Sequence, residues 1–439
     1  MKTTSERIQD CQAILSVELD PDEVEKGMQE AYKHLVGRVK VPGFRPGKAP
    51  RAVLERYIGS QAMMEEALEH LIPEAYEGAL KKESLEPVAR PRIELVKVNP
   101  VTFKATVPLK PVVRLGNYRA EMRLQPDQVE VTEDEVNTAI RSIQDQTATL
   151  VPVDRASQFG DVLIVNIEGR EKGETFLDHK DSLCELKKGS PAPLPGFAEA
   201  LVGASKGETR EFTLSFPADH ENKRIAGRDY SFRVTINEVK EKKLPELNDE
   251  FAKENGAESL AQWRERLVEQ LRKRKEASIR RQFEAKLVDA VVKFAELEYP
   301  PALVDEEIDD LVRDQAANFK EGMRGLEDYY LKSINKTMEE YRQELREMAR
   351  ERVVRALVLR QVAEEEKIEV TEAEVDVEIE RMVKEDPDNA ERLKKFWTLP
   401  QARNSVKNYL LNRKIIARLE AIARGEVQPV EKEKNENAA

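Results

Sequence analysis

Two cationic side chains and one aromatic side chain, those of Arg45, Lys48 and Phe44, lie together in a window of the sequence that has no acidic residue. This window, residues 31–54, holds six basic residues: Lys33, Arg38, Lys40, Arg45, Lys48 and Arg51. Lys and Arg form charge-assisted hydrogen bonds with phosphate and carboxylate groups, and an exposed ring adds an apolar contact. The pattern therefore favours contact with a phosphate-rich or acidic surface, although a solvated basic turn would have the same composition.

Prolines and glycines interrupt this basic window and set its backbone. Pro42, Pro46 and Pro50 cannot donate backbone hydrogen bonds, and each one restricts the residue before it. Gly43 and Gly47 supply turn positions between them. The sequence thus predicts a stiff, exposed loop between two helices rather than a continued helix or strand.

The string GFRPGKAP, residues 43–50, resembles the ribosome-docking signature Gly-Phe-Arg-x-Gly-Lys-x-Pro of the trigger factor family of bacterial ribosome-associated chaperones. It fits at every fixed position, and these are Gly43, Phe44, Arg45, Gly47, Lys48 and Pro50. The resemblance implies that this loop binds a protein and nearby RNA beside the ribosomal exit tunnel. Pro46 stands where some members of the family have a third basic residue, a change expected to weaken the phosphate contact without altering the docking mode.

Most enzyme chemistries find no matching pattern in the chain. The four histidines are expected to be too scattered for a metal site, and they are His34, His70, His179 and His220. The glycines around Lys48 do not have the spacing of a phosphate-binding loop, and Ala49 stands where a magnesium-binding hydroxyl is needed. No Ser or Cys stands out as an activated nucleophile. We therefore expect no metal or other cofactor, and no hydrolase, kinase or dehydrogenase.

Residues 151–245 have the alternating pattern of strands, punctuated by glycine, with one short helix near 195–202. This region resembles an FKBP-type peptidyl-prolyl isomerase domain, a bent antiparallel sheet with one helix. The residues that carry the resemblance are Gly160-Asp161, Pro195 to Phe197, Phe216-Pro217 and Gly227. Prolyl isomerisation needs only a dry apolar pocket that favours the twisted amide, because the barrier comes from lost amide resonance.

The resemblance also implies which side chains line such a prolyl pocket. Phe176, Leu194, Phe197 and Phe232 match the apolar positions of the family. Four pocket positions depart from it, and these are Ile167, Cys184, Pro193 and His220, the last lying near the tyrosine of the family. Two outcomes stay open: a weak isomerase, or a domain that holds peptides with negligible turnover, in which Phe197 and Phe232 simply pack the sheet against its helix.

Composition limits the class of protein. The chain has 439 residues, of which 36% are charged and only 6% aromatic, and this balance suits long exposed amphipathic helices. Its net charge of −12 argues against general nucleic-acid binding, so any RNA contact should be local to the basic window. The N-terminal residues lack the apolar run of a secretory signal, and no stretch approaches a membrane span. We expect a soluble cytoplasmic protein.

Periodicity locates the elements that would position these residues. Alternating apolar residues predict strands near 13–19 and 93–107, and Asp20-Pro21 predicts the start of a helix. Capping-box patterns at Thr132 and Ser259 begin further helices. Helices are also expected near 50–80, 302–321, 337–366, 371–383 and 405–424. The sequence leaves open which of eight side chains are exposed: Leu311, Phe319, Tyr329, Tyr330, Met338, Tyr341, Met348 and Tyr409.

These patterns predict an α+β multidomain protein: a small α/β N-terminal domain, an FKBP-like bent antiparallel sheet with one helix, and an elongated all-α chaperone body. The predicted parts are 1–112, ribosome binding; 113–150, a connector and first part of the helical body; 151–245, isomerase; 246–425, helical chaperone domain; and 426–439, a disordered tail.

The resemblance implies an ATP-independent chaperone that docks at the ribosome and holds nascent and unfolded polypeptides, with a secondary prolyl isomerase activity. It also allows a homodimer off the ribosome. The main alternative is a free-standing FKBP-type prolyl isomerase whose helices dimerise it or bind clients. A periplasmic folding factor and a structural RNA-binding protein are disfavoured by the N-terminus and by the net charge.

Overall fold

The computed structural model describes residues 1–171, 174–190, 194–216, 227–334 and 336–426, and these fall into two compact units. One unit comprises Met1–Pro126 with Arg280–Ala439, and the other is Asp127–Ile279. No described helix is both long enough and apolar enough to cross a membrane.

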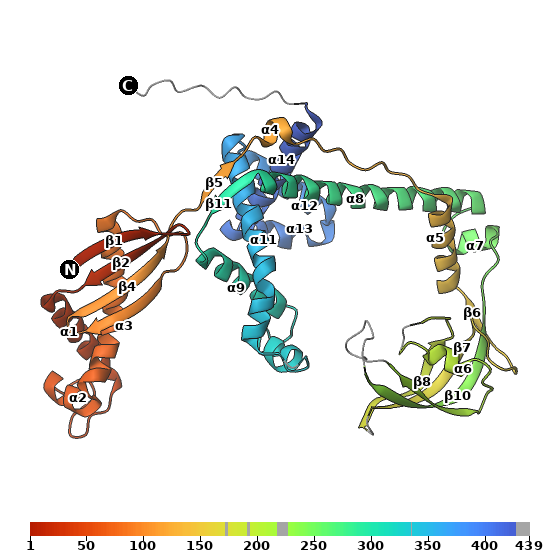
Figure 1. The fold of residues 1–439 in the computed structure, drawn as a ribbon, viewed down its shortest axis with the longest axis horizontal. Coiled ribbons are helices and arrows are strands. Elements are labelled where there is room, and N and C mark those ends of the chain that lie inside the picture. The colour runs from red at the N-terminus through yellow and green to blue at the C-terminus, as the bar shows by residue number, and fades with distance from the viewer. Residues whose placement is uncertain (172–173, 191–193, 217–226, 335, 427–439) are drawn as a thin grey trace. The chain divides into compact units, whose positions relative to one another are not determined.

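The N-terminal part of the first unit is a four-stranded antiparallel sheet with helices packed on one face (Figure 1). The strands, in sheet order, are β1 (Lys2–Ile8), β2 (Gln12–Glu18), β4 (Val101–Pro108) and β3 (Arg92–Val98). The helices are α1 (Pro21–Arg38), α2 (Arg51–Ile58) and α3 (Ser60–Glu83). Leu15 and Val17 on β2 and Phe103 on β4 are fully buried, because alternation places them on the face that the helices cover.

The sequence predicted most of this part but missed two features. The Asp20 capping box begins α1 as expected, and residues 39–50 form no regular element. Strand β1 was not predicted, since its outward-facing residues give it no apolar alternation. The single helix predicted near 50–80 is divided into α2 and α3 at Gly59, whose φ of +92° cannot continue a helix.

The second unit contains a five-stranded antiparallel sheet with a short helix against it. The elements are β6 (Thr149–Pro152), β7 (Val162–Glu171), β8 (Glu174–Glu185), α6 (Phe197–Leu201), β9 (Thr209–Ser215) and β10 (Asp229–Lys243). The sheet order is β6-β10-β7-β8, with β9 paired to β10. Val165 on β7 and Val234 on β10 pack on Leu201 of α6, giving the predicted sheet-on-helix core.

Three helical segments complete the second unit. They are α5 (Glu133–Gln146), α7 (Asp249–Glu254) and the N-terminal part of α8 (Leu260–Phe294). Val136, Phe251 and Trp263 join them in a separate small core. This grouping differs from the predicted division, in which residues 113–150 and 246–425 belong to the helical body.

The remaining elements belong to the first unit. They are β5 (Val112–Leu115), α4 (Tyr118–Glu121), the rest of α8, β11 (Ala295–Glu298), α9 (Ala302–Ala316), α10 (Met323–Gly325), the π-helical η1 (Leu326–Leu331), α11 (Met338–Glu365), α12 (Glu372–Glu385), the 3-10 helix η2 (Pro387–Asn389), α13 (Ala390–Trp397) and α14 (Pro400–Arg424). The two-stranded sheet of β5 and β11 was not predicted.

These helices share no single core. One core joins α8, α11 and α14 through Leu287, Val358 and Leu419, and a second forms where α9 and α11 lie side by side. A third, around Val375 and Val406, holds α12 on α14. Trp397 of α13 packs against this same core. Separate small cores leave much helix surface accessible, as the composition suggested.

Candidate functional site

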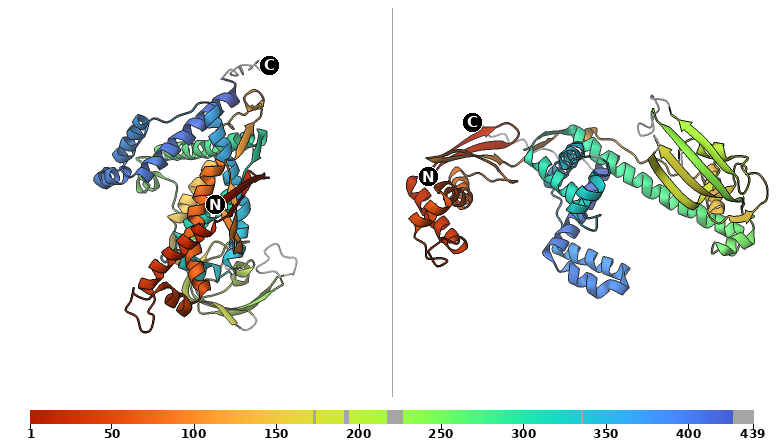
Figure 2. Two further views of the ribbon diagram at one scale, coloured as in Figure 1. Left: turned by 90° about the vertical axis from the view of Figure 1, so that its left-hand side faces the viewer. Right: turned by 90° about the horizontal axis from the view of Figure 1, so that it is seen from below.

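The loop between α1 and α2 is fixed at its base by burial and by backbone hydrogen bonds. Val41 and Ala49 are buried in the domain core on either side of the exposed residues. The N–H of Gly47 donates to the carbonyl of Val36 at 2.9 Å, and the Tyr32 hydroxyl donates to the carbonyl of Ala49 at 2.8 Å. Figure 2 shows this loop, in red, projecting beyond the helices of its domain. The loop base is therefore held by the domain, while its tip is free.

The tip presents the predicted side chains to solvent. Phe44 is 42% exposed, and Arg45 and Lys48 are also exposed. Within the described residues neither cation has an acidic partner. Gly43 and Gly47 have φ of +84° and +81°, and nothing lies within 4 Å of a Cβ built on either one. The backbone conformation alone therefore accounts for glycine at both positions.

One residue of the basic window is paired within its own domain. Arg51, the first residue of α2, forms an ion pair with Glu25 on α1. The hydrogen bond from Arg51 lowers the pKa of the Glu25 carboxyl and raises the pKa of the guanidinium. The charge of Arg51 is thus compensated within the domain, unlike those of Arg45 and Lys48.

The isomerase-like domain contains a cluster of aromatic rings between its sheet and α6. The ring of Phe197 lies 5.0 Å from that of Phe232 and 5.5 Å from that of Phe212, both edge-on. Phe176 on β8 meets Phe232 at 5.9 Å and Tyr230 at 5.3 Å. Edge-to-face pairs at these centroid distances are favourable. The predicted residues Phe176, Phe197 and Phe232 therefore come together.

Burial divides the predicted pocket residues into two groups. Phe197, Phe232 and Ile167 are 0%, 2% and 7% exposed, so they belong to the core of this domain. Phe176 is 46% exposed, and Leu194 is partly buried against the same core. His220 and Pro193 lie outside the described residues. Accessible apolar surface is thus supplied mainly by Phe176 and Leu194.

Phe212, Tyr230 and Gly169 also belong to this cluster and were not predicted as pocket residues from the sequence. Tyr230 is buried beside Phe176, and the alternation along β10, which places 230, 232, 234 and 236 on one face, would have revealed it. Gly169 lies beneath the rings, because a Cβ there would be 2.9 Å from Phe176 and 3.0 Å from Phe232. Glycine therefore permits the rings to approach the sheet.

Two side chains with shifted pKa values lie near the start of β7, where Cys184 of β8 pairs with Leu163. Asp161 accepts bonds from Arg155 at 2.6 and 2.9 Å and from the N–H of Gln158 at 2.8 Å. Burial opposes ionisation of Asp161 most strongly, but these bonds outweigh it and lower the pKa of the carboxyl. Cys184 is partly buried, and desolvation raises the pKa of its thiol to about 11. A thiol so protonated at neutral pH is a poor nucleophile.

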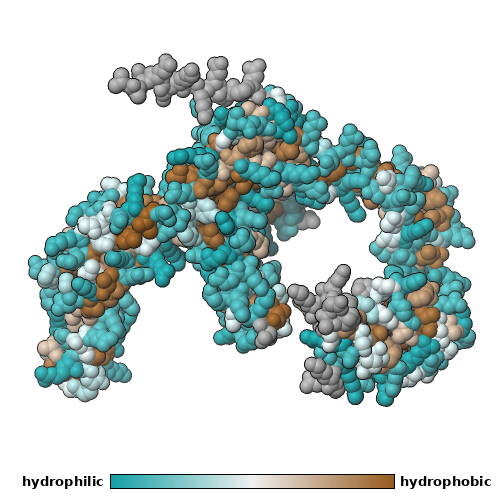
Figure 3. Space-filling model, in the orientation of Figure 1, coloured by the Kyte–Doolittle hydropathy of each residue, from teal (hydrophilic) through white to brown (hydrophobic). Residues whose placement is uncertain are grey.

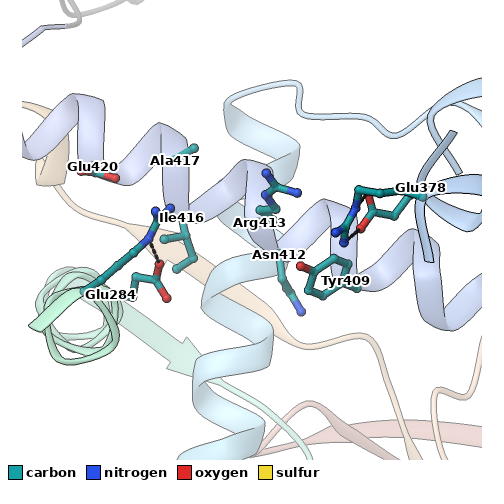
Figure 4. Close-up of a pocket in the computed structure, with 10 residues that line it drawn as sticks. Glu284, Glu378, Tyr409, Asn412, Arg413, Ile416, Ala417 and Glu420 are labelled. Atoms are coloured by element: carbon teal, nitrogen blue, oxygen red, sulfur yellow. Dashed lines mark hydrogen bonds and ion pairs between the residues drawn. The ribbon is translucent and has the colours of Figure 1, made fainter. Parts of the chain in front are cut away.

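A groove in the helical part combines charged and apolar lining. Its volume is about 950 Å³, and Figure 4 shows its lining from α8, α12 and α14. Arg381 pairs with Glu378 at 2.6 Å and Arg280 with Glu284 at 3.0 Å, while the ring of Tyr409 is exposed between α12 and α14. Figure 3 shows the same alternation of apolar and hydrophilic patches on the visible surface of the helices.

The structure gives the exposure of seven of the eight helical side chains whose exposure the sequence left open. Tyr330, Met348 and Tyr409 are exposed, and Leu311 is buried. Partial exposure describes the other three, which are Phe319, Met338 and Tyr341. Tyr329 has a side chain outside the described part of the structure. Accessible aromatic and methionine side chains are therefore present on these helices.

The expectation that the histidines are scattered is wrong for two of them. His34 on α1 and His70 on α3 have ring centroids 5.6 Å apart. Glu66, also on α3, has its carboxylate close to both rings. Tertiary packing of α1 on α3 brings these residues together although they are 36 positions apart in sequence.

Three protein-family models match the chain. Those described as "Bacterial trigger factor protein (TF)" and "Bacterial trigger factor protein (TF) C-terminus" match residues 1–143 and 259–420. The model described as "FKBP-type peptidyl-prolyl cis-trans isomerase" matches residues 153–237. Together the three matches follow the order of parts read from the sequence.

Individual relatives agree over nearly the full length. The chain is 36% identical over 426 residues to a trigger factor of Dehalococcoides mccartyi, with 96% of this chain and 95% of the relative covered. It is 35% identical to a trigger factor of Halothermothrix orenii, with coverage of 95% and 98%. A solved trigger factor chaperone structure is 22% identical, with 96% and 100% covered and a TM-score of 0.48.

Proposed function

Because this chain belongs to the trigger factor family of ribosome-associated chaperones, we propose that residues 43–50 dock it at the ribosomal exit tunnel. Phe44 supplies an apolar contact, and Arg45 and Lys48 supply charge-assisted bonds to a ribosomal protein surface and to nearby RNA phosphates. The carrying observation is that a complete signature lies on a loop whose base is buried and whose three side chains are exposed without acidic partners.

Replacing Phe44, Arg45 and Lys48 together by alanine tests the docking proposal. We expect co-sedimentation with ribosomes to be lost, while suppression of aggregation in solution is kept, because the substitutions lie in no core. A matched control is Arg56→Ala with Tyr57→Ala, which removes an exposed cation and an exposed ring from α2 next to the loop. Unchanged sedimentation of the triple variant would refute the assignment of the loop.

The RNA part of the proposal makes a separate claim on salt dependence. Each phosphate contact contributes roughly 0.7–0.9 to the slope of log affinity against log salt concentration. Lys48→Ala should therefore make the slope shallower by about that amount, whereas Phe44→Ala should weaken binding with the slope unchanged. If the Lys48→Ala variant and the parent have equal slopes, Lys48 makes no phosphate contact. The loop would then bind ribosomal protein only.

We further propose that the helices hold nascent and unfolded polypeptides by many weak contacts. The exposed rings of Tyr330 and Tyr409 and the thioether of Met348 adapt to varied apolar segments. Ion pairs around the groove, such as Arg381 with Glu378, keep the surface between them hydrated. Several weak contacts to one client chain together bind it with avidity. Because each contact is weak, the client is released without nucleotide hydrolysis.

The isomerase activity is proposed to be weak and to depend on Phe176. Phe197 and Phe232 are almost wholly buried, whereas Phe176 is 46% exposed, so a prolyl ring can reach Phe176 more readily. The same domain is then a weak isomerase and a peptide-holding module.

We also propose that the protein acts in the cytoplasm, where its ribosomal partner is, and that it self-associates as a homodimer when off the ribosome.

Phe176→Ala tests the isomerase proposal. One lost aromatic contact of about 0.5–1.5 kcal/mol predicts a fall in kcat/KM of roughly 2- to 10-fold on a prolyl peptide. Phe159→Ala is the matched control, because Phe159 is equally exposed at 46% in the same domain and lies outside the ring cluster. If the two variants are equally active, Phe176 is not part of the prolyl pocket.

A further inference from the structure

A second constellation of possible ligands lies on the helical face of the N-terminal domain, apart from the loop tip. Glu66 and His70 are four residues apart on α3, and so they lie on one side of that helix. His34 faces them from α1. One ligand atom from each of the three residues can be chosen so that all lie within 4.8 Å of one another.

The helices that carry these residues are tightly packed beside them. A Cβ built on Gly27 of α1 would clash with the side chain of Leu71, the neighbour of His70 on α3. Ala31, one turn before His34, is fully buried against the same core. The backbone separation at this point is therefore fixed by packing, and only side-chain rotation remains to adjust the three ligands.

A small rotation is enough to bring the ligands to bonding distance. Metal–nitrogen and metal–oxygen bonds of about 2.0–2.2 Å place the ligands of a tetrahedral ion roughly 3.3–3.6 Å apart. Nδ1 of His34 is already in contact with the carboxylate of Glu66, and the side chains of these residues are 39% and 19% exposed. Closing the remaining gap therefore takes about 1 Å of movement by exposed imidazoles.

We propose that His34, Glu66 and His70 bind a divalent transition metal ion of the zinc class and thereby link α1 to α3. Two imidazoles and one carboxylate suit Zn²⁺, Co²⁺ or Ni²⁺ rather than Mg²⁺ or Ca²⁺, which prefer oxygen ligands. A water molecule completes the tetrahedron. The ion replaces the direct bond between His34 and Glu66 by one metal bond to each of the three residues.

This metal link acts on the base of the docking loop. His34 is two residues before Val36, whose carbonyl accepts the N–H of Gly47. An ion that joins α1 to α3 therefore stabilises the helix end from which the loop begins. The proposal concerns metal binding and domain stability alone, so it stands or falls separately from ribosome docking.

Titration of the full chain with Co²⁺, followed by displacement with Zn²⁺, tests the site directly. We expect one equivalent to give the visible absorption of tetrahedral Co²⁺ and Zn²⁺ to abolish it. Hydrogen exchange of α1 and α3 amides should slow by about 100-fold when free Zn²⁺ is 100 times its Kd, since only the folded domain binds.

His70→Asn and Glu66→Gln should each weaken Zn²⁺ binding by at least about 10-fold, because even residues that merely orient a ligand contribute 10- to 100-fold. His179→Asn is the matched control, an exposed histidine on β8 in the other unit. Metal-free exchange of α1 and α3 amides checks that each variant is folded. Zn²⁺ binding that survives both substitutions, or falls equally in the control, would overturn the proposal in favour of adventitious binding to the acidic surface.

Discussion

Phe44 in the docking loop and Phe197 in the isomerase domain show two opposite uses of one side chain. Phe44 lies on a loop tip, 42% exposed, and its neighbours fix the backbone rather than the ring. Phe197 is fully buried and contacts two other rings. The first is available to a partner, and the second holds a sheet on its helix.

The difference shows which site can be assigned from a short motif. In the loop, Phe44, Arg45 and Lys48 are exposed and Gly43 and Gly47 adopt turn conformations, so none of these residues is needed for a core. Residues of the aromatic cluster serve the core and the pocket together. Loss of activity on substituting Phe197 or Phe232 would therefore not identify a catalytic residue.

The strongest way to sharpen this contrast is to truncate both phenylalanines. Phe197→Ala should destabilise the isomerase domain by about 3–5 kcal/mol, because it leaves a cavity among packed rings. Phe44→Ala should change stability by less than about 0.5 kcal/mol. Hydrogen exchange of β10 amides in the full chain measures the first effect, and exchange of β2 amides measures the second.

Comparable destabilisation by the two substitutions would break the contrast. It would mean that the loop ring packs on its own domain in solution. Exchange of β2 amides in the Phe197 variant serves as the internal reference, since that strand lies in the other compact unit.

A smaller loss of stability is expected on replacing Asp161, which directly precedes β7 in the sheet of the isomerase-like domain. Asp161→Asn should cost about 1.5–3 kcal/mol at pH 7, the usual range for buried hydrogen bonds to a charged group. Asp178→Asn, an exposed carboxylate on β8, is the matched control. Opening free energies of β7 and β10 amides by hydrogen exchange measure both variants.

The pH dependence of this effect follows from the lowered pKa of Asp161. A carboxyl whose pKa is lower in the folded state than in the unfolded state stabilises the fold at pH values above its unfolded pKa, about 3.9. This stabilisation is lost as the pH falls through the folded pKa. The gap between parent and Asp161→Asn should therefore be full at pH 7 and smaller at pH 3. An undiminished gap would show that packing, not ionisation, is responsible.

The smallest expected effect concerns the loop backbone. Gly47→Ala forces a side chain to φ of +81°, which costs about 1–2 kcal/mol and should weaken ribosome binding by roughly 5- to 30-fold. Gly37→Ala is the matched control, because Gly37 is helical and a Cβ there meets nothing within 4 Å. That control should keep affinity and gain up to about 1 kcal/mol of helix stability. Equal affinities of the two variants would exclude a role for loop rigidity.

Local patterns predicted most elements but not those stabilised mainly by distant partners. The capping boxes at Thr132 and Thr371 begin α5 and α12, since the hydrogen bonds involved span only three residues. The strand pair β5 and β11 was missed, because each strand has four residues and its partner is about 180 residues away. Helix α13 was also missed, for none of its residues is buried and its apolar pattern is short.

Local sequence is enough to predict the loop at residues 39–50, because proline, glycine and charge act within a few residues and need no partner from elsewhere in the fold. Tertiary structure decided which rings are exposed and which histidines meet. His34 and His70 approach only when α1 packs on α3, and packing leaves Phe176 on β8 46% exposed while it buries Phe197 on α6. Burial and proximity depend on contacts between distant segments, which no local pattern specifies.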